Sequence, residues 1–355
     1  MGRLDPLFKM LIQQGASDLH LAAGNPPKMR SRGVLEALTI QKITADELEL
    51  AMAELLTDEA KGEFAQFKDV EFSHQVPGMA RFRASYFLTQ QGPAAVFRLV
   101  PEVAVPLEQL GLPPQFEALL ERRAGLVLVA APMGSGRSTL HSSIVDRINA
   151  TSARHVISLE EPIEMSHPRK KGLVMQREIA RDTATFESGV RAALRSDADV
   201  LVVGNVPDYQ TTQVLLTAAE SGRLVVALPA IPGAVRTVER LVEMTPPEWQ
   251  AETRAMLADN LLGVLGQILV RRKDMPARVA AHELLLATAD LASALREGEL
   301  RDAVSVIEAG KAMGMRSLDD SLAALVAGNV ISVEEAHRKA GDKARFIAPP
   351  EGAAG

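Results

Sequence analysis

The chain has 355 residues, no cysteine and a formal net charge of -6. This length predicts two domains, because a single hydrophobic core seldom grows that large. The negative charge argues against the concentrated basic face of a nucleic-acid-binding protein, and the lack of cysteine excludes disulfides and thiolate metal sites.

No apolar run approaches the roughly 20 residues that span a bilayer. The first ten residues, MGRLDPLFKM, also lack the apolar centre of a signal peptide. We therefore expect a cytoplasmic protein without direct membrane insertion. Aromatic residues make up only 4% of the chain, whereas Ala, Leu and Val are abundant. This composition favours helices packed on a buried sheet, the α/β class.

The first hundred residues predict a small domain of helices and strands. An apolar helical pattern over residues 7–12 stops at Gly15, and the alternating segment 17–21 predicts a strand. Residues 79–88 alternate between polar and apolar types, and a Gly-Pro turn signal separates them from a second run, 94–100. This order predicts a β-hairpin.

Three arginines belong to the predicted hairpin. Arg81 and Arg83 share one face of the first strand, and Arg98 lies in the second strand. In this context alone they indicate solvated surface charge, because such charge is common on exposed strands.

Residues 101–113 are rich in proline and glycine and are expected to link an N-terminal domain, 1–100, to a second domain, 114–345. In the second domain, uninterrupted apolar runs alternate with helical segments. Strands buried on both faces have this pattern, so we expect a mostly parallel sheet flanked by helices. The four runs are residues 125–130, 156–159, 200–203 and 224–228.

After about residue 250 the pattern indicates helices. Residues 346–355 are rich in Pro, Gly and Ala, and they predict a disordered tail.

The sequence APMGSGRST, residues 131–139, follows an apolar strand and precedes a helical run. Strand, glycine loop and helix are the context of a phosphate-binding loop, in which backbone N–H groups and the helix N-terminus hold phosphate oxygens. A glycine turn without a ligand is the other interpretation. The candidate nucleotide-binding residues are Gly134, Ser135, Gly136, Arg137, Ser138 and Thr139, with the Ser138 hydroxyl as a candidate ligand of Mg²⁺.

The loop departs from the pattern GxxxxGK[ST] at two positions. Ala131 replaces the first glycine, which is a mild change where the backbone allows a Cβ atom. Arg137 replaces the lysine, and its longer, planar guanidinium should position a γ-phosphate less well than a compact ammonium. Nucleotide binding is therefore expected to survive better than catalysis.

A P-loop ATPase also needs a carboxylate at the end of a nearby strand, to orient or deprotonate the attacking water. The run 200–203 is followed by Gly204 and Asn205, and an amide cannot take a proton. The run 156–159 is followed by Glu160, which is the best remaining candidate base. An N-capping or solvated carboxylate is the alternative interpretation of Glu160.

These residues resemble one family, the PilT twitching-motility ATPases and their relatives among type IV pilus and type II secretion motors. The resemblance runs from Leu7 to about Ala340. The blocks that carry it, in family order, are GASDLHLAAGNPPKMRSRG, ARFRASYF, AAVFRLVP, GLVLVAAPMGSGRST, EEPIE, VMQREIARDT, RAALRSDADVLVVG, LTAAESG, RVAAHELLLAT and MGMRSLDDSL.

The resemblance implies a PAS-like N-terminal α+β domain followed by a RecA-like P-loop ATPase domain with a helical C-terminal part. It implies ATP with Mg²⁺ as ligand and a hexameric ring, in which arginines of the N-terminal domain or linker meet the nucleotide. Arg81, Arg83 and Arg98 are then the candidates. Such motors act on a platform protein at the inner-membrane face of a pilus machine and drive pilus retraction.

The chain departs from the family at several functional blocks. Arg137 stands at the place of the Walker lysine, and Asn205 at the place of a glutamate. Arg223 and Pro229 replace both histidines of the His box. Ala292 replaces an arginine in the C-terminal retraction motif. The apolar framework is kept, and Glu160 is the main catalytic group still in place.

Two hypotheses follow for the mechanism. In the first, the chain is an accessory or hydrolysis-impaired motor subunit that binds ATP and forms a homo-hexamer or a mixed hexamer with an active homologue. In the second, it is a working ATPase in which Arg137 is the phosphate cation and Glu160 the base. A nucleotide or second-messenger sensor is a third idea, but nothing in the sequence singles out such a ligand.

Overall fold

The computed structural model describes residues 2–31, 34–100, 103–298 and 303–347. It divides into two compact units, Met1–Val103 and Ala104–Gly355. This division falls within the stretch 101–113 that we expected as a linker. Leu107 and Leu112 are buried in a core of the second unit, so the later part of that stretch packs with this unit.

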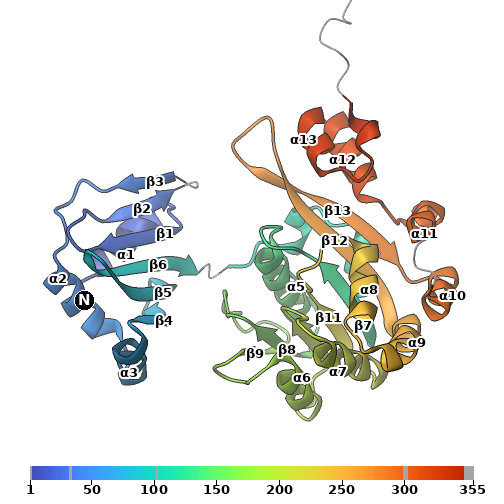
Figure 1. The fold of residues 1–355 in the computed structure, drawn as a ribbon, viewed down its shortest axis with the longest axis horizontal. Coiled ribbons are helices and arrows are strands. Elements are labelled where there is room, and N and C mark those ends of the chain that lie inside the picture. Colours follow the sequence, from blue (N-terminus) through green and yellow to red (C-terminus); the bar gives the residue numbers. More distant parts are fainter. Residues whose placement is uncertain (1, 32–33, 101–102, 299–302, 348–355) are drawn as a thin grey trace, which may run out of the picture. The chain divides into compact units, whose positions relative to one another are not determined.

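The N-terminal unit is a six-stranded antiparallel sheet in the order β3-β2-β1-β6-β5-β4 (Figure 1). Its elements are α1 (Asp5–Gln13), β1 (Asp18–Ala22), β2 (Lys28–Ser31), β3 (Val34–Ala37), α2 (Ala45–Leu55), α3 (Asp58–Phe67), β4 (Asp69–Val76), β5 (Ala80–Thr89) and β6 (Gly92–Val100). Phe8 of α1 stacks on Phe82 of β5 with ring centroids 4.4 Å apart, and both side chains are fully buried. The predicted first helix, first strand and β5–β6 hairpin are confirmed.

The second unit is built on a seven-stranded sheet in the order β13-β12-β7-β11-β10-β8-β9. All neighbouring strands are parallel except β13, which runs antiparallel to β12. The predicted mostly parallel sheet is thus confirmed. The elements as far as β11 are η1 (Leu107–Leu110), α4 (Pro114–Leu119), β7 (Gly125–Ala130), α5 (Arg137–Thr151), β8 (His155–Glu160), β9 (Leu173–Glu178), α6 (Phe186–Leu194), β10 (Val200–Val203), α7 (Tyr209–Glu220) and β11 (Leu224–Ala227).

The remaining part of the chain corrects one expectation. The elements are α8 (Ala234–Glu243), η2 (Pro247–Trp249), α9 (Gln250–Asn260), β12 (Leu261–Arg271), β13 (Arg278–Leu286), α10 (Ala289–Glu297), α11 (Ala303–Ala309), η4 (Gly310–Met313), α12 (Leu318–Ala327), α13 (Val333–Lys339) and η5 (Lys343–Phe346). A purely helical region after residue 250 was wrong, because β12 and β13 lie there. An apolar run such as LLGVLGQILV suits a buried helix and a buried strand equally, and here pairing with β7 decides for the strand.

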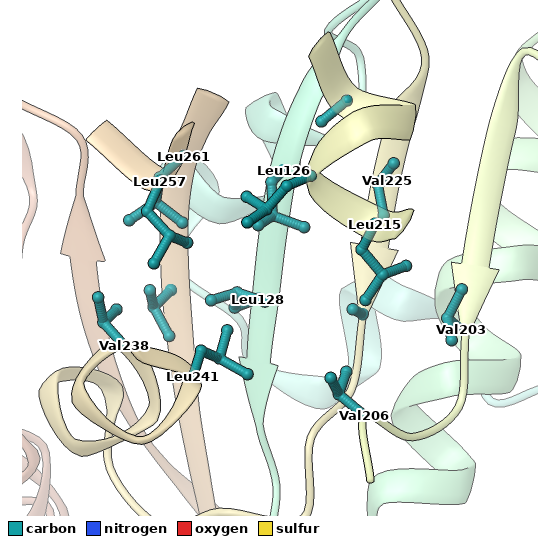
Figure 2. Packing of buried hydrophobic residues seen from close by; sticks show 14 of the residues in the cluster. Leu126, Leu128, Val203, Val206, Leu215, Val225, Val238, Leu241, Leu257 and Leu261 are labelled. Carbon is teal, nitrogen blue, oxygen red and sulfur yellow. The ribbon is translucent and has the colours of Figure 1, made fainter. Parts of the chain in front are cut away.

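Both faces of the parallel sheet are buried, which explains its uninterrupted apolar strands. Along β7, Leu126 and Leu128 belong to one core, and Val127 and Val129 to the core on the other face. Figure 2 shows Leu128 on the first face, close to Leu241 of α8. Because these strands are parallel, their carboxyl ends and the loops that follow lie along the same side of the sheet. Packing on both faces holds the strands in place.

The C-terminal helices form a smaller core with the β12–β13 hairpin. Val270 and Ala281 of the hairpin are buried together with Leu322 of α12 and Ile331. Phe346 is also buried in this cluster, which contradicts the disorder predicted from residue 346 at this residue. Residues 348–355 lie outside the described residues. Among the helices that are described, none is long and apolar enough to cross a membrane.

Candidate nucleotide site

The glycine loop connects β7 to α5, as the sequence predicts. Gly134 and Gly136 have positive φ angles of 78° and 85°, a region that favours glycine. Gly136 is the N-cap of α5, so the helix starts at Arg137 with its free N–H groups at the loop. Ala131 is fully buried, and it is not among the residues with positive φ in the described chain. Its backbone therefore accepts a Cβ atom where the pattern has glycine.

Two polar atoms of this loop fit an anionic ligand. Nη1 of Arg137 and Oγ of Ser135 are buried, and neither has a hydrogen-bond partner among the described residues. A buried donor without a partner costs free energy, and phosphate oxygens are acceptors that would satisfy it. The residues present thus fit the triphosphate of a nucleotide, with the Ser138 hydroxyl exposed at the start of α5.

A narrow cavity of about 40 Å³ lies between the loop and the end of β8. A volume of this size holds a few water molecules and no nucleotide base. Its lining includes Arg137, Ser138, His141, Glu160, Glu161 and Gly204. The structure therefore brings together the predicted cation, the predicted hydroxyl and the predicted base.

Glu160 is the last residue of β8, and it is 5% exposed. Its Oε1 atom accepts hydrogen bonds from Ser158 Oγ at 2.8 Å and from Gln176 Nε2 at 2.9 Å. No described helix follows Glu160 directly, so it is not an N-cap, and its burial shows that the carboxylate is not solvated. Two donors hold one of its oxygens and leave the other, Oε2, for a further partner.

His141 is a site residue that the sequence analysis missed. It lies one turn after Arg137 on α5 and is 5% exposed. Its Nε2 atom is 3.3 Å from Ser158 Oγ, and its Nδ1 atom is 3.8 Å from Glu160 Oε2. Burial lowers the pKa of His141, although the nearby Glu160 carboxylate opposes this effect, so the ring is neutral at pH 7. The helical spacing from Arg137 was the available signal.

Asn205 lies two residues beyond β10, next to the site. The neighbouring Gly204 donates its N–H to Leu159 O at 2.8 Å, and a Cβ atom on Gly204 would lie 3.7 Å from Glu160 Cα. Gly204, and not Asn205, contributes to the cavity lining. The end of β10 therefore brings no carboxylate to this cavity.

The two positions of the His box are not together in this fold. Pro229 follows the carboxyl end of β11, and its carbonyl accepts the N–H of Ala131 at 3.2 Å. Arg223 directly precedes β11 and so lies at the amino end of this strand, where its Nη1 atom donates to Ser221 O at 2.8 Å. Of the two, only Pro229 adjoins the phosphate loop.

The three candidate arginines of the N-terminal unit have partners within that unit. Arg81 Nε donates to Ser73 Oγ at 2.7 Å, and Arg83 Nη2 pairs with Glu71 Oε2 at 2.6 Å. Arg98 Nε donates to Asp18 Oδ1 at 2.8 Å. Their part in nucleotide binding stays a prediction.

Comparison with known proteins assigns the family. The family model of type II/IV secretion system proteins matches residues 2–345. The type IV pilus retraction ATPase PilT of Pseudomonas aeruginosa is 39% identical over 334 residues, which are 94% of this chain and 97% of that protein. The chain belongs to the type II/IV secretion system family, in its PilT branch.

Further relatives agree with this PilT-family membership. A twitching motility protein of Neisseria gonorrhoeae is 37% identical over 88% of this chain and 84% of its own length. The crystal structure of the pilus retraction motor PilT with bound ADP matches with a TM-score of 0.90 at 34% identity, over 97% of this chain and 98% of that one. This match confirms the expected α/β fold of an N-terminal domain and a RecA-like ATPase domain.

Proposed function

We propose that this PilT-family chain is an ATP-binding subunit of a type IV pilus retraction motor whose own hydrolysis is impaired. It acts in the cytoplasm at the inner-membrane face of the pilus machine, in a homo-hexamer or in a mixed hexamer with an active homologue, and its partner there is the platform protein. The family membership supports the retraction role, and the ADP bound to a related PilT supports nucleotide binding.

One observation supports the impaired site. The cavity beside the loop receives a guanidinium from Arg137, while β10 ends in Gly204 and Asn205 and provides no carboxylate there. An amide cannot accept the proton of an attacking water, and an arginine does not reproduce the position of a lysine ammonium. Gly134 to Thr139 would hold ATP, with Ser138 as a ligand of its Mg²⁺, and the bound ion would neutralise phosphate charge.

A second candidate function, an active retraction ATPase, is favoured by the geometry of Glu160. Ser158 and Gln176 fix its Oε1 atom, so the carboxylate is already oriented, and it lines the same cavity as Arg137. A buried, oriented carboxylate is what a general base requires. In this alternative Arg137 serves as the phosphate cation.

Mixing experiments test the accessory role. The chain is purified alone and together with an intact PilT homologue, and native mass spectrometry and ATP turnover are measured for both samples. We expect hexamers, mixed rings in the second sample and a changed turnover of the homologue. A strict monomer under all nucleotide conditions would contradict the ring, and rings that never mix would contradict the accessory role.

A further inference from the structure

Side chains of the β12–β13 hairpin hold the carbonyl groups of the phosphate loop. Gln267 of β12 donates from Nε2 to Ser135 O at 2.8 Å, and Arg278 of β13 donates from Nη1 to Gly134 O at 3.3 Å. Gln267 is 5% exposed, so its contact with the loop is shielded from water. The loop is thus fastened to a hairpin more than 130 residues away in the sequence, as the separation of 132 residues between Gln267 and Ser135 shows.

His282 completes this contact from the next strand. It lies opposite Gln267 in the β12–β13 ladder, and its Nε2 atom is 2.9 Å from Gln267 Oε1. Because Ser135 O can only accept, Gln267 must turn its amide nitrogen to the loop and its oxygen to His282. His282 must then donate from Nε2. Burial lowers the pKa of His282 to about 4, so the ring is neutral at pH 7 and carries this single N–H.

The backbone of His282 is itself anchored. Its N–H donates to Ser321 Oγ of α12 at 3.1 Å, and His282 is only 4% exposed. A row of hydrogen bonds therefore runs from Ser321 in the C-terminal core through His282 and Gln267 to the loop. Buried hydrogen-bond networks rigidify the arrangement of their members.

The contact with Ser135 O decides where the next N–H points. In a planar trans peptide, the C=O of Ser135 and the N–H of Gly136 point in opposite directions. Gln267 fixes the carbonyl on the hairpin side, and so the N–H of Gly136 faces away from the hairpin. Gly136 also packs closely here, because a Cβ atom on it would lie 3.3 Å from Gln267 Nε2. Backbone N–H groups that point inward are what a phosphate loop offers its ligand.

We propose that Gln267 and His282 are positioning residues of the nucleotide site: they hold the Ser135–Gly136 peptide in the orientation that binds phosphate. This proposal rests on the proposed nucleotide-binding function. Neither residue touches the nucleotide, and both act through the loop backbone. Loss of the hydrogen bonds of Gln267 and His282 should weaken nucleotide binding while the fold persists.

The test measures the Kd of ADP by calorimetry for the full chain and its variants. Gln267→Glu keeps the shape but places a carboxylate oxygen against Ser135 O, and it should weaken binding about tenfold or more. His282→Leu frees Gln267 to rotate, and roughly a threefold to tenfold loss is expected. His282→Gln keeps an N–H donor and should restore most of the affinity. The double variant Gln267→Glu with His282→Leu should lose no more ADP affinity than Gln267→Glu alone, because the two residues act through the same row of hydrogen bonds.

Gln213→Glu is the matched control. Gln213 of α7 also donates from Nε2 to a single acceptor, Thr253 Oγ1, at 2.7 Å, but it does not contact the loop. Its variant should bind ADP like the wild type. Circular dichroism of each nucleotide-free variant checks the fold, and Gln267→Leu replaces Gln267→Glu if the charged variant does not fold.

The outcomes distinguish the positioning role of Gln267 and His282 from the proposed nucleotide-binding function. Folded Gln267 and His282 variants that bind ADP as tightly as the wild type would overturn the positioning role. The same holds if His282→Gln is as weak as His282→Leu, or if Gln213→Glu is weakened equally. If the wild type itself binds no ADP, the proposed nucleotide-binding function fails, and the positioning role with it.

Discussion

Arg137 and Glu160 line one narrow cavity, the first from the first turn of α5 and the second from the end of β8. The arginine brings a buried Nη1 donor that has no partner among the described residues. The glutamate brings an oriented carboxylate. The cavity thus has a cation that can bind a phosphate and an oriented carboxylate that can deprotonate a water, but it lacks a lysine and a carboxylate from β10.

Restoring both missing groups should raise ATP turnover. Arg137→Lys supplies a compact ammonium at the loop, and Asn205→Glu supplies a carboxylate after β10. We expect the double variant to hydrolyse ATP at least roughly tenfold faster than the wild type, because loss of one such group typically costs orders of magnitude. Steady-state phosphate release measures the effect. Arg191→Lys on the exposed face of α6 is the matched control, and no gain in the double variant would refute the assignment of these two substitutions.

The stability of the second unit should fall in mild acid because of His282. The unfolded residue takes up a proton below its ordinary pKa of 6.5, whereas the folded residue does so only near pH 4. In this window the unfolded state binds more protons, so the free energy of unfolding decreases as the pH falls. The shift corresponds to a loss of about 3 kcal/mol.

His282→Gln isolates that contribution. Urea unfolding of the wild type and of His282→Gln is compared at pH 7 and at pH 4.5. The variant should lose less stability on acidification than the wild type, by about 2 kcal/mol. An identical loss in both proteins would show that His282 does not titrate as its burial implies.

Arg98 should stabilise the N-terminal unit through Asp18. Burial disfavours the charge on Asp18, but hydrogen bonds from Ser17 and Arg98 outweigh this effect, and the pKa of Asp18 is lowered. Arg98→Ala leaves a buried carboxylate with one side-chain donor fewer and should cost about 1 kcal/mol. Arg83→Ala breaks an exposed pair with Glu71 and should cost less than about 0.5 kcal/mol.

The pH dependence of the stability change in Arg98→Ala tests whether Arg98 acts through Asp18. Because the folded pKa of Asp18 is lowered, its contribution is present above the ordinary value of 3.8 and is lost as the pH falls through the folded value. Thermal unfolding of Arg98→Ala and wild type should therefore converge in acid. A difference that is the same at pH 7 and at pH 3 would mean that Arg98 stabilises the unit in another way.

The packed sheet should be sensitive to truncation of Leu128. This side chain is fully buried on the interior strand β7, in the cluster of Figure 2. Leu128→Ala leaves a cavity and should lower the free energy of unfolding by about 2 to 5 kcal/mol. Leu173→Ala on β9 is the control, because Leu173 is 52% exposed and should cost less than about 1 kcal/mol. Equal losses in urea unfolding would contradict the assignment of the core.

The sequence predicted the fold where strands are buried on both faces. The apolar runs 125–130 and 200–203 match β7 and β10 to the residue. It failed at β12 and β13, because pairing with β7 selects the strand there and the apolar pattern alone does not. Secondary structure that depends on a partner strand far away in the chain leaves little local signal.

The residues of the candidate site were also predicted only in part. The loop and Glu160 have local signals, a glycine pattern and an acid at a strand end. Gln176 and Gln267 lack such signals, because their roles depend on contacts across strands and with the loop. His141 had only its helical spacing from Arg137, and its contact with Ser158 required the fold.

Steady-state ATP turnover of the isolated chain, measured beside its Glu160→Gln variant, tests the central claim most directly. An impaired site predicts turnover well below about one per second for the wild type, with any residual activity removed by Glu160→Gln. Turnover of about one per second or faster that disappears in Glu160→Gln would contradict the account, because Arg137 and Glu160 would then suffice for catalysis.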